Sequence, residues 1–268
     1  MRAKRVVIKV GTSTLTYENG TLNLRRIESL CKVLSDLKNS GKEVILVSSG
    51  AIGVGMGKLG LEQKPKEIER KQALAAIGQC ELMFIYDKLF GEYNQTVAQV
   101  LLTRDVIDNP HSKKNVINTF EMLLSMGIIP VVNENDTVAT DELDSMNFGE
   151  NDTLSAIVAK IVGAELLIIL TDFDGLYEED PRKNPNAGKI DEVNQIDDKI
   201  RSIAGRSGSS RGTGGMSTKV SAAFIANQAG IDCCVMSGQN PKSLYRLFDD
   251  KHPGTIFKAH GKSDKNIR

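Results

Sequence analysis

Two lysines in glycine-rich surroundings are the residues of this chain with the most specific chemical potential. Lys9 lies near the end of the apolar run RVVIKV, two residues before Gly11. A lysine in a buried strand is costly unless it meets a partner or a ligand, although at a strand end its ammonium can also reach solvent. Lys219 follows the glycine-rich residues 213–215 by about one helical turn. Glycine N–H groups at a helix start bind phosphate, and a lysine adds a point charge, so the two lysines predict a polyphosphate site. The alternative for residues 213–219 is a flexible linker with a Ser or Thr N-cap.

A polar stretch between residues 128 and 156 is the second candidate. It begins with the apolar run IIPVV, continues through NEND and GEND, and returns to an apolar helical pattern. Asn133 and Glu134 are expected just past the strand. Ligands of parallel α/β sheets bind beyond the carboxyl ends of strands, so Asp136 and Asn151 are candidates for holding a small charged molecule. The alternative is a solvated loop with Asn151 as a helix N-cap, and residues 139–148 are expected to form a flap over the ligand.

The ends of two other predicted strands also have residues that could contact a ligand. Ser49, Gly50 and Ala51 follow the run EVILV, where the glycine lets a ligand approach the backbone and a helix start favours anions. A tight turn with Ser49 as N-cap is the alternative. Thr171 and Asp172 end the run LLIIL at the expected ligand position. None of these candidate residues is a nucleophile paired with a histidine. Together they indicate phosphoryl transfer by positioning and electrostatics.

Two general phosphate-binding motifs are ruled out by their sequence context. A P-loop requires GxxxxGK[ST]; the chain has the ending at residues 261–263, but Ile256 stands where the first glycine should be. Residues 55–60 match GxGxxG but lie well past their strand. Dinucleotide binding requires that motif at the strand-to-helix turn, so this segment is expected to be helix and loop.

The elements that must position these residues alternate between strands and helices. Strands are expected at residues 5–10, 43–47, 96–102, 128–132, 166–170, 232–236 and 254–257, and helices at 27–40, 71–90, 115–126, 153–162, 220–229 and 241–248. Apolar strands that alternate with amphipathic helices predict an α/β fold, a three-layer αβα sandwich around a mainly parallel sheet. We expect two lobes on one continuous sheet, residues 1–150 and 151–258, and a frayed tail at 259–268.

Composition narrows the class of function. The 268 residues are 40% hydrophobic and 25% charged, and 34 Lys+Arg balance 34 Asp+Glu. These are globular values, and the charge balance argues against nucleic-acid binding. No apolar run approaches the ~20 residues of a membrane span, and the N-terminus has no signal-peptide pattern, so we expect a cytoplasmic protein. The four cysteines and three histidines lack metal-ligand spacing, so no metal held by the protein is expected.

A series of segments resembles the glutamate 5-kinases of the amino-acid kinase family. In chain order they are VVIKVGTSTL, SSGAIGVG, QALAAIGQ, QVLLTRD, IPVVNENDTVAT, GENDTLSA, LTDFDGLY, DPRKNP and GTGGMSTK. The match as a whole runs from about Val6 to Phe257. The resemblance implies the amino-acid kinase fold. It also implies transfer of the ATP γ-phosphate to the side-chain carboxylate of L-glutamate, the first step of proline biosynthesis. The first lobe would hold glutamate and the second would hold ATP, with Mg²⁺ bound mainly by the nucleotide phosphates.

The resemblance also implies residue roles. Lys9 and Lys219 would bind the phosphates and stabilise the transferring group, and Asp152 would hold the two lysines in place. Glutamate would be bound by Ser49, Gly50, Ala51, Asp136 and Asn151. The nucleotide would be bound by Lys9, Thr171, Asp172, Thr213, Gly214, Gly215, Met216, Ser217, Thr218 and Lys219.

The family further suggests a homo-oligomer, a dimer or tetramer, that proline inhibits. Many members continue into a PUA domain, whereas this chain ends 11 residues after Phe257 and is expected to lack it. One alternative is a kinase of the same fold acting on acetylglutamate, aspartate, carbamate or a nucleoside monophosphate; NENDTV and SSGAI argue against it. The other is an inactive amino-acid sensor, which would not need both lysines and Asp152.

Overall fold

A computed structural model describes residues 2–17, 19–138, 151–206 and 215–259. The expected flap at residues 139–148, the predicted nucleotide ligands Thr213 and Gly214, and residues 260–268 of the expected tail lie outside the described residues. Within the described ranges, none of the helices combines the length and the apolar character that a membrane crossing requires.

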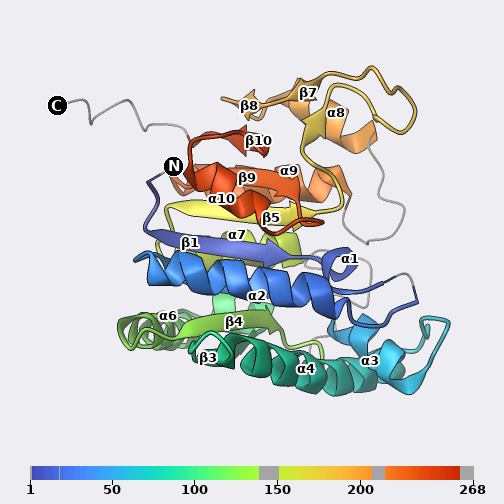
Figure 1. The fold of residues 1–268 in the computed structure, drawn as a ribbon, viewed down its shortest axis with the longest axis vertical. Coiled ribbons are helices and arrows are strands. Elements are labelled where there is room, and N and C mark those ends of the chain that lie inside the picture. Colours follow the sequence, from blue (N-terminus) through green and yellow to red (C-terminus); the bar gives the residue numbers. More distant parts are fainter. Residues whose placement is uncertain (1, 18, 139–150, 207–214, 260–268) are drawn as a thin grey trace.

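One sheet of eight strands forms the centre of the molecule (Figure 1). Side by side, its strands are β3 (Val97–Leu102), β4 (Ile129–Glu134), β2 (Glu43–Ser48), β1 (Arg5–Val10), β5 (Leu166–Thr171), β9 (Asp232–Ser237), β10 (Gly254–Phe257) and β8 (Glu192–Val193). Neighbouring strands are parallel except β9 and β10, which are antiparallel. A separate short pair is formed by β6 (Leu176–Tyr177) and β7 (Lys189–Ile190). The prediction of a mainly parallel sheet is confirmed.

Helices cover both faces of the sheet. Those described are α1 (Thr12–Leu15), α2 (Leu24–Asn39), α3 (Ala51–Leu59), α4 (Ile68–Gly91), α5 (Arg104–Asp108), α6 (Pro110–Ser125), α7 (Asn151–Ile161), α8 (Asp198–Arg206), α9 (Met216–Gln228) and α10 (Ser243–Phe248). Successive side chains of a strand point to opposite faces. Accordingly, Val6 and Ile8 of β1 pack with α2, α4 and α10 on the face that is in front in Figure 1. Val7 packs with α6, α7 and α9 on the opposite face. The predicted three-layer αβα sandwich is confirmed.

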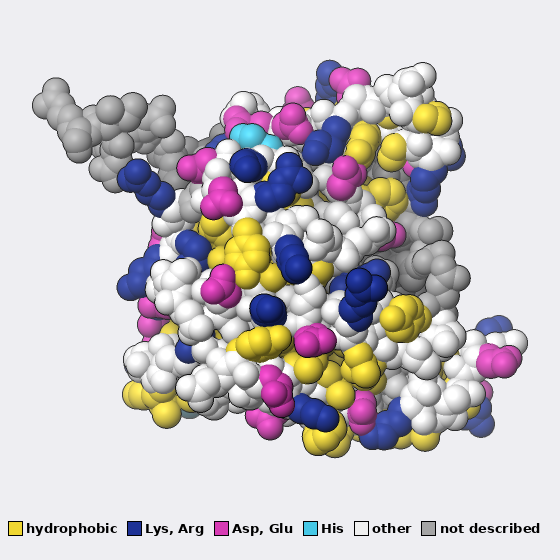
Figure 2. All heavy atoms as spheres, viewed as in Figure 1, with side chains coloured by type: hydrophobic (Ala, Val, Ile, Leu, Met, Phe, Trp, Pro, Cys, Tyr) yellow, Lys and Arg dark blue, Asp and Glu magenta, His cyan; other side chains and the backbone are white. Residues whose placement is uncertain are grey.

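Charges of both signs are mixed over one face of the molecule. Figure 2 shows Lys and Arg side chains interspersed with Asp and Glu on the face that α2 and α10 cover, in keeping with the net charge of +0.

Three local differences from the predicted elements affect the site. β4 includes Asn133 and Glu134, which are 1% and 4% exposed, instead of ending before them. Gly50, with φ of 101°, is the N-cap of α3, so the interpretation of Ser49 as N-cap is wrong. The helix α7 begins at Asn151 itself, whose side-chain amide donates to Asn133 instead of capping the helix.

Glycines allow α3 and α4 to cross with their backbones in contact. A Cβ at Gly55 on α3 would lie 2.1 Å from the carbonyl oxygen of Leu74 on α4, and a Cβ at Gly78 on α4 would lie 1.7 Å from that of Ala51. Only glycine fits such approaches. The GxGxxG segment is therefore helix with a packing function, and it does not form the strand-to-helix turn of dinucleotide sites.

Candidate active site

The first strand lies at the switch point of the sheet. From β1 the chain continues into β2 on one side, and it later adds β5 on the other side. Ligand sites of open α/β sheets lie at such points, beyond the carboxyl ends of the strands. Lys9 is the penultimate residue of β1, and by strand alternation it shares the face of Val7, which α7 and α9 cover. β1 therefore delivers a lysine to the expected ligand position.

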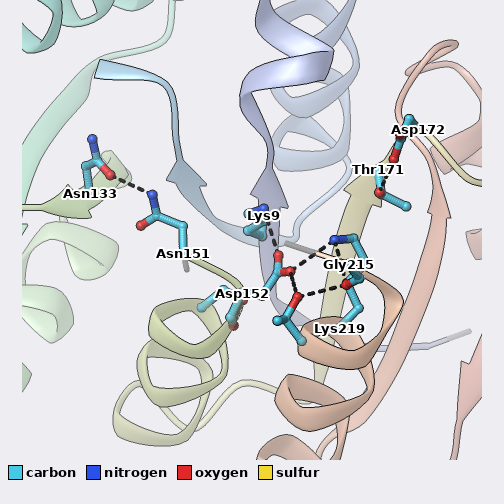
Figure 3. A network of polar contacts seen from close by, with 10 residues as sticks. Lys9, Asn133, Asn151, Asp152, Thr171, Asp172, Gly215 and Lys219 are labelled. Carbon is cyan, nitrogen blue, oxygen red and sulfur yellow. Dashed lines mark hydrogen bonds and ion pairs between the residues drawn. The ribbon is translucent and has the colours of Figure 1, made fainter. Parts of the chain in front are cut away.

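Asp152 joins Lys9 and Lys219 in a buried cluster (Figure 3). Asp152 Oδ1 lies 2.7 Å from Lys9 Nζ, and Asp152 Oδ2 lies 3.1 Å from Lys219 Nζ. Asp152 is 1% exposed, Lys9 7% and Lys219 4%, and they come from α7, β1 and α9. One carboxylate balances only one of the two ammonium groups, so the three side chains keep one positive charge. Because charges interact strongly where water is scarce, the cluster is suited to binding an anion.

The start of α9 supports the same cluster. The Thr218 hydroxyl lies 3.0 Å from Asp152 Oδ2 and 2.9 Å from the carbonyl oxygen of Gly215, and it can donate its one proton to either. Lys219 Nζ lies 3.4 Å from the same carbonyl oxygen. Gly215 is the N-cap of α9, so the first N–H groups of this helix point to the edge of the sheet where the lysines meet.

The two lysines keep the Asp152 carboxyl group ionised. Burial, the largest single effect, would raise the pKa of Asp152, but attraction to Lys9 and Lys219 and hydrogen bonds from both lysines together outweigh it. The pKa falls from 3.8 to about 2. A carboxylate with so low a pKa is a poor proton acceptor at neutral pH, which favours a positioning role for Asp152 over general-base catalysis.

Three side-chain amides lie in line beside the cluster. Asn133 Nδ2 donates to Gln79 Oε1 at 2.8 Å, and Asn151 Nδ2 donates to Asn133 Oδ1 at 3.1 Å. Asn151 directly precedes Asp152 on α7. Asn151 Oδ1 is buried and has no hydrogen-bond partner among the described residues. A buried acceptor without a partner costs stability, so this oxygen is suited to a donor group on a ligand.

The connection between β2 and α3 lies at the same edge of the sheet. Ser49 N–H donates to the carbonyl oxygen of Val10 at 3.0 Å, which ties this connection to the end of β1. Gly50 has the left-handed conformation that favours glycine. Ser49 and Ala51 are 9% and 3% exposed, so a ligand at this edge would meet a largely buried backbone turn.

The remaining predicted ligand-binding residues lie at the ends of β5 and β4. Thr171, the last residue of β5, donates its hydroxyl proton to Asp172 Oδ1 at 2.9 Å, and its carbonyl oxygen accepts from Gly238 N–H at 2.7 Å. In the view of Figure 3, Thr171 and Asp172 lie on the opposite side of the lysine cluster from Asn133 and Asn151. Asp136 lies in the turn after β4.

The predicted residues differ in what they can contribute to the site. Lys9, Asp152 and Lys219 are in direct contact, and Thr218 joins them. The described residues that follow β2, β4 and β5 lie at the same edge of the sheet. Met216 differs, because its side chain packs in the apolar core at 1% exposure and only its backbone can face a ligand.

Sequence reasoning missed one member of the site, Gln79. The only signal was its place in the segment QALAAIGQ, where a glutamine directly follows the close-packed Gly78 of α4. Its partner, Asn133, is 54 positions away in the sequence, so no local pattern could connect the two.

The protein side chains provide few ligands for a metal ion. Among the described residues, no three histidine, cysteine, aspartate or glutamate side chains are grouped to hold one. Both oxygens of Asp152 already contact ammonium groups. A divalent cation at this edge of the sheet would take most of its ligands from a bound polyphosphate, as Mg²⁺ commonly does.

Comparison with known proteins gives three findings. The amino acid kinase family matches residues 4–237. The chain is similar to the glutamate 5-kinase of Clostridium perfringens, at 58% identity over 258 residues and 96% of each chain, and to that of Listeria innocua, at 56% identity over 95% of this chain and 93% of the other. It also resembles the crystal structure of carbamate kinase from Giardia lamblia bound to AMP-PNP, with a TM-score of 0.66, 14% identity, and coverage of 96% and 99%. At that identity the structural likeness concerns the fold alone.

Proposed function

This chain belongs to the amino acid kinase family and, within it, to the glutamate 5-kinases, and we propose that it transfers the γ-phosphate of ATP to the side-chain carboxylate of L-glutamate. The product is L-glutamyl 5-phosphate, and the reaction is the first step of proline biosynthesis. The observation that carries the proposal is the buried cluster of Lys9, Asp152 and Lys219 at the carboxyl edge of the sheet.

The reaction requires electrostatic help more than proton transfer. The glutamate carboxylate is already ionised at neutral pH, so no general base is needed. One of its oxygens forms a bond to the γ-phosphorus while the bond from that phosphorus to the β-phosphate oxygen breaks, releasing ADP. The barrier comes largely from repulsion between two anions. Lys9 and Lys219 reduce it by placing two ammonium groups beside the transferring phosphoryl group.

Asp152 acts in this proposal by positioning the lysines. It touches both ammonium groups at once, so it fixes their separation before any substrate binds. Such preorganisation avoids the cost of reorienting charged groups during the reaction. Both ammonium groups can then act on the same phosphates.

Glutamate would bind on the side of β2 and β4. Asn151 Oδ1, which has no hydrogen-bond partner within the described part of the chain, can accept a hydrogen bond from the α-ammonium group of the amino acid. Backbone N–H groups of the turn formed by Ser49, Gly50 and Ala51 can donate to a carboxylate, because the glycine there permits close approach. Asp136 would add a second acceptor near the ammonium group.

The nucleotide would bind on the side of β5 and α9. N–H groups at the start of α9, from Gly215 to Lys219, would hold the phosphates, with Thr171 and Asp172 at the neighbouring strand end. Mg²⁺ would enter with ATP, held mainly by phosphate oxygens, and would neutralise part of their charge. Thr213 and Gly214 remain proposed nucleotide ligands.

Three wider features belong to the same proposal. All four cysteines are free thiols, as is usual in the reducing cytoplasm, where we place the enzyme. The family resemblance supports feedback inhibition by proline and a homo-oligomer, a dimer or tetramer. It also supports the division into an amino-acid lobe before residue 150 and a nucleotide lobe after it.

A hydroxylamine trap tests the substrate directly. Incubation with ATP, Mg²⁺ and hydroxylamine should convert L-glutamate to its hydroxamate, whereas L-aspartate and N-acetyl-L-glutamate should give none. The Lys9→Ala chain, purified in the same way, controls for contaminating kinases. Hydroxamate from one of the other acids instead would assign a different kinase of this fold, and no hydroxamate from any acid would favour the amino-acid sensor.

A further inference from the structure

The row of amides from Gln79 to Asn151 crosses the carboxyl edge of the sheet. Asn133 is in register with Ile129 and Val131, which pack on the face that α4 covers. Gln79 belongs to α4 on that face, and Asn151 begins α7 on the opposite face. Two hydrogen bonds, 2.8 Å and 3.1 Å long, therefore link helices on both sides of the sheet through one strand end.

One backbone group fixes the orientation of all three amides. Glu134 N–H, which can only donate, lies 2.9 Å from the side chain of Asn133, so the Asn133 oxygen must face it. That oxygen also faces Asn151, which must then present its NH₂ group. The Asn133 NH₂ group must face Gln79, which must then present its oxygen.

A consequence for the ligand follows from this polarity. Because the Asn151 NH₂ group is committed to Asn133, its oxygen is the atom left without a partner among the described residues. An amide free to flip would offer a donor or an acceptor with similar ease. In this row Asn151 offers only an acceptor.

We propose that Gln79 is a positioning residue for the amino-acid substrate, acting through Asn133 to hold Asn151 with its oxygen toward the substrate ammonium group. The proposal rests on the proposed function, because it presumes an amino acid at this site. Asn133 is 1% exposed, so without the Gln79 oxygen its NH₂ group would be buried without an acceptor. Rotation of Asn133 would relieve that cost and would release Asn151 from its fixed orientation.

The experiment compares Gln79→Met with Gln72→Met, which makes the same substitution two turns earlier on α4. Initial rates of glutamyl hydroxamate formation are measured with varied glutamate and varied ATP. We expect Gln79→Met to raise KM for glutamate about tenfold, the effect of one lost hydrogen bond. KM for ATP should stay within about twofold in both variants, and Gln72→Met should leave KM for glutamate unchanged.

A double-mutant cycle with Asn151→Ala tests the route of the effect. If Gln79 acts through Asn151, then Gln79→Met should add little to the KM of Asn151→Ala. If Gln79→Met instead loosened α4 in general, it would raise KM for glutamate by the same factor in the Asn151→Ala background as in the wild type. It would also change KM for ATP. Gln79→Glu keeps an acceptor oxygen and should lie nearer to the wild type than Gln79→Met.

Three results would overturn the proposal. They are a KM for glutamate within twofold of the wild type in Gln79→Met, full additivity with Asn151→Ala, and equal impairment in Gln79→Glu and Gln79→Met. The wild-type chain is measured in the same assay, so failure of the proposed function shows separately as no glutamyl hydroxamate from the wild type, and the positioning role then falls with it.

Discussion

At the scale of single residues, the site depends on three charges with only one negative among them. Asp152 is ionised because two lysines contact it, and each lysine is buried with its charge because Asp152 contacts it. Removing one member of a buried charged group usually costs more than the group contributed, since the others stay buried and unpaired. In the proposed mechanism the cluster acts in catalysis, and loss of any one of its charges should destabilise the fold.

The pH dependence of stability should reveal the Asp152 carboxylate. Its pKa is about 2 in the folded chain and ordinarily 3.8, so the contribution is full above about pH 5 and is lost as pH falls toward 2. That lowering corresponds to about 2 kcal/mol. Urea unfolding at neutral pH should show Asp152→Asn to be less stable than the wild type by about 3 kcal/mol, and the difference should shrink between pH 4 and pH 2.5.

A surface carboxylate provides the control for that measurement. Asp191 is largely exposed and lies 3.6 Å from Lys189, and Asp191→Asn should change stability by no more than about 0.5 kcal/mol at any of these pH values. If Asp152→Asn destabilised the chain equally from pH 7 to pH 2.5, the carboxylate charge would not be the source of the stabilisation.

At the scale of elements, α4 is the support of the amino-acid end of the site. Its Gln79 contacts Asn133 at the end of β4, and its Tyr86, one heptad later, lies with its hydroxyl 2.9 Å from Ser48 Oγ at the end of β2. Burial raises the pKa of Tyr86, so this hydroxyl stays neutral at working pH. One face of the helix thus fixes two strand ends that border the proposed glutamate site.

The close crossing of α3 and α4 should be intolerant of a single methyl group. Gly78→Ala would place a Cβ 1.7 Å from a carbonyl oxygen of α3 and must push the helices apart, at a cost of about 3 kcal/mol or more. Gly91→Ala at the end of the same helix meets no described atom within 4 Å and should not destabilise, since alanine favours helix. Thermal unfolding of the two variants checks the contrast; equal melting temperatures would contradict the close packing.

Sequence patterns predicted the elements better than their contacts. Apolar runs gave β1, β2 and β5 almost to the residue, because a strand buried on both faces must be apolar. The end of β4 was missed, since Asn133 and Glu134 look like loop residues until their partners in other elements are known. The antiparallel direction of β10 was also not predictable, because a strand as short as GTIF suits either orientation.

The position of the candidate site was more predictable than the contacts between its side chains. Lys9 near the end of β1 and the glycine after β2 indicated the edge at which we propose that a ligand binds, because ligands of parallel sheets bind beyond the carboxyl ends of the strands. The link of Asp152 to both lysines came from the family resemblance alone, since these contacts span 143 positions to Lys9 and 67 to Lys219. Gln79 was missed because its place after Gly78 does not reveal its partner Asn133, which lies 54 positions away in the sequence.

At the scale of the whole molecule, two apolar cores join both halves of the chain. Val7 and Ile45 share one core with Val220 and Val235, and Ile8 and Leu46 share the other with Met236. Residues before and after position 150 therefore stabilise each other directly, which predicts that they unfold together.

Ligand binding should raise the stability of the whole molecule in one step. A nonhydrolysable ATP analogue with Mg²⁺, at 100 times its Kd, should raise the free energy of unfolding by about 2.7 kcal/mol. Calorimetry should show one transition that shifts upward with the ligand, and a smaller shift in Lys219→Ala. Two transitions, of which only one responds to the ligand, would contradict a shared core.

The central claim is that Lys9 from β1 and Lys219 from α9 act on the same transferring phosphoryl group, and the turnover of the lysine variants tests it most directly. The rate of glutamyl hydroxamate formation at saturating substrates should fall about 100-fold or more in Lys9→Ala and in Lys219→Ala. Lys160→Ala, at an exposed lysine of α7, should keep the wild-type rate. Near-normal turnover by purified, folded Lys219→Ala would contradict the claim.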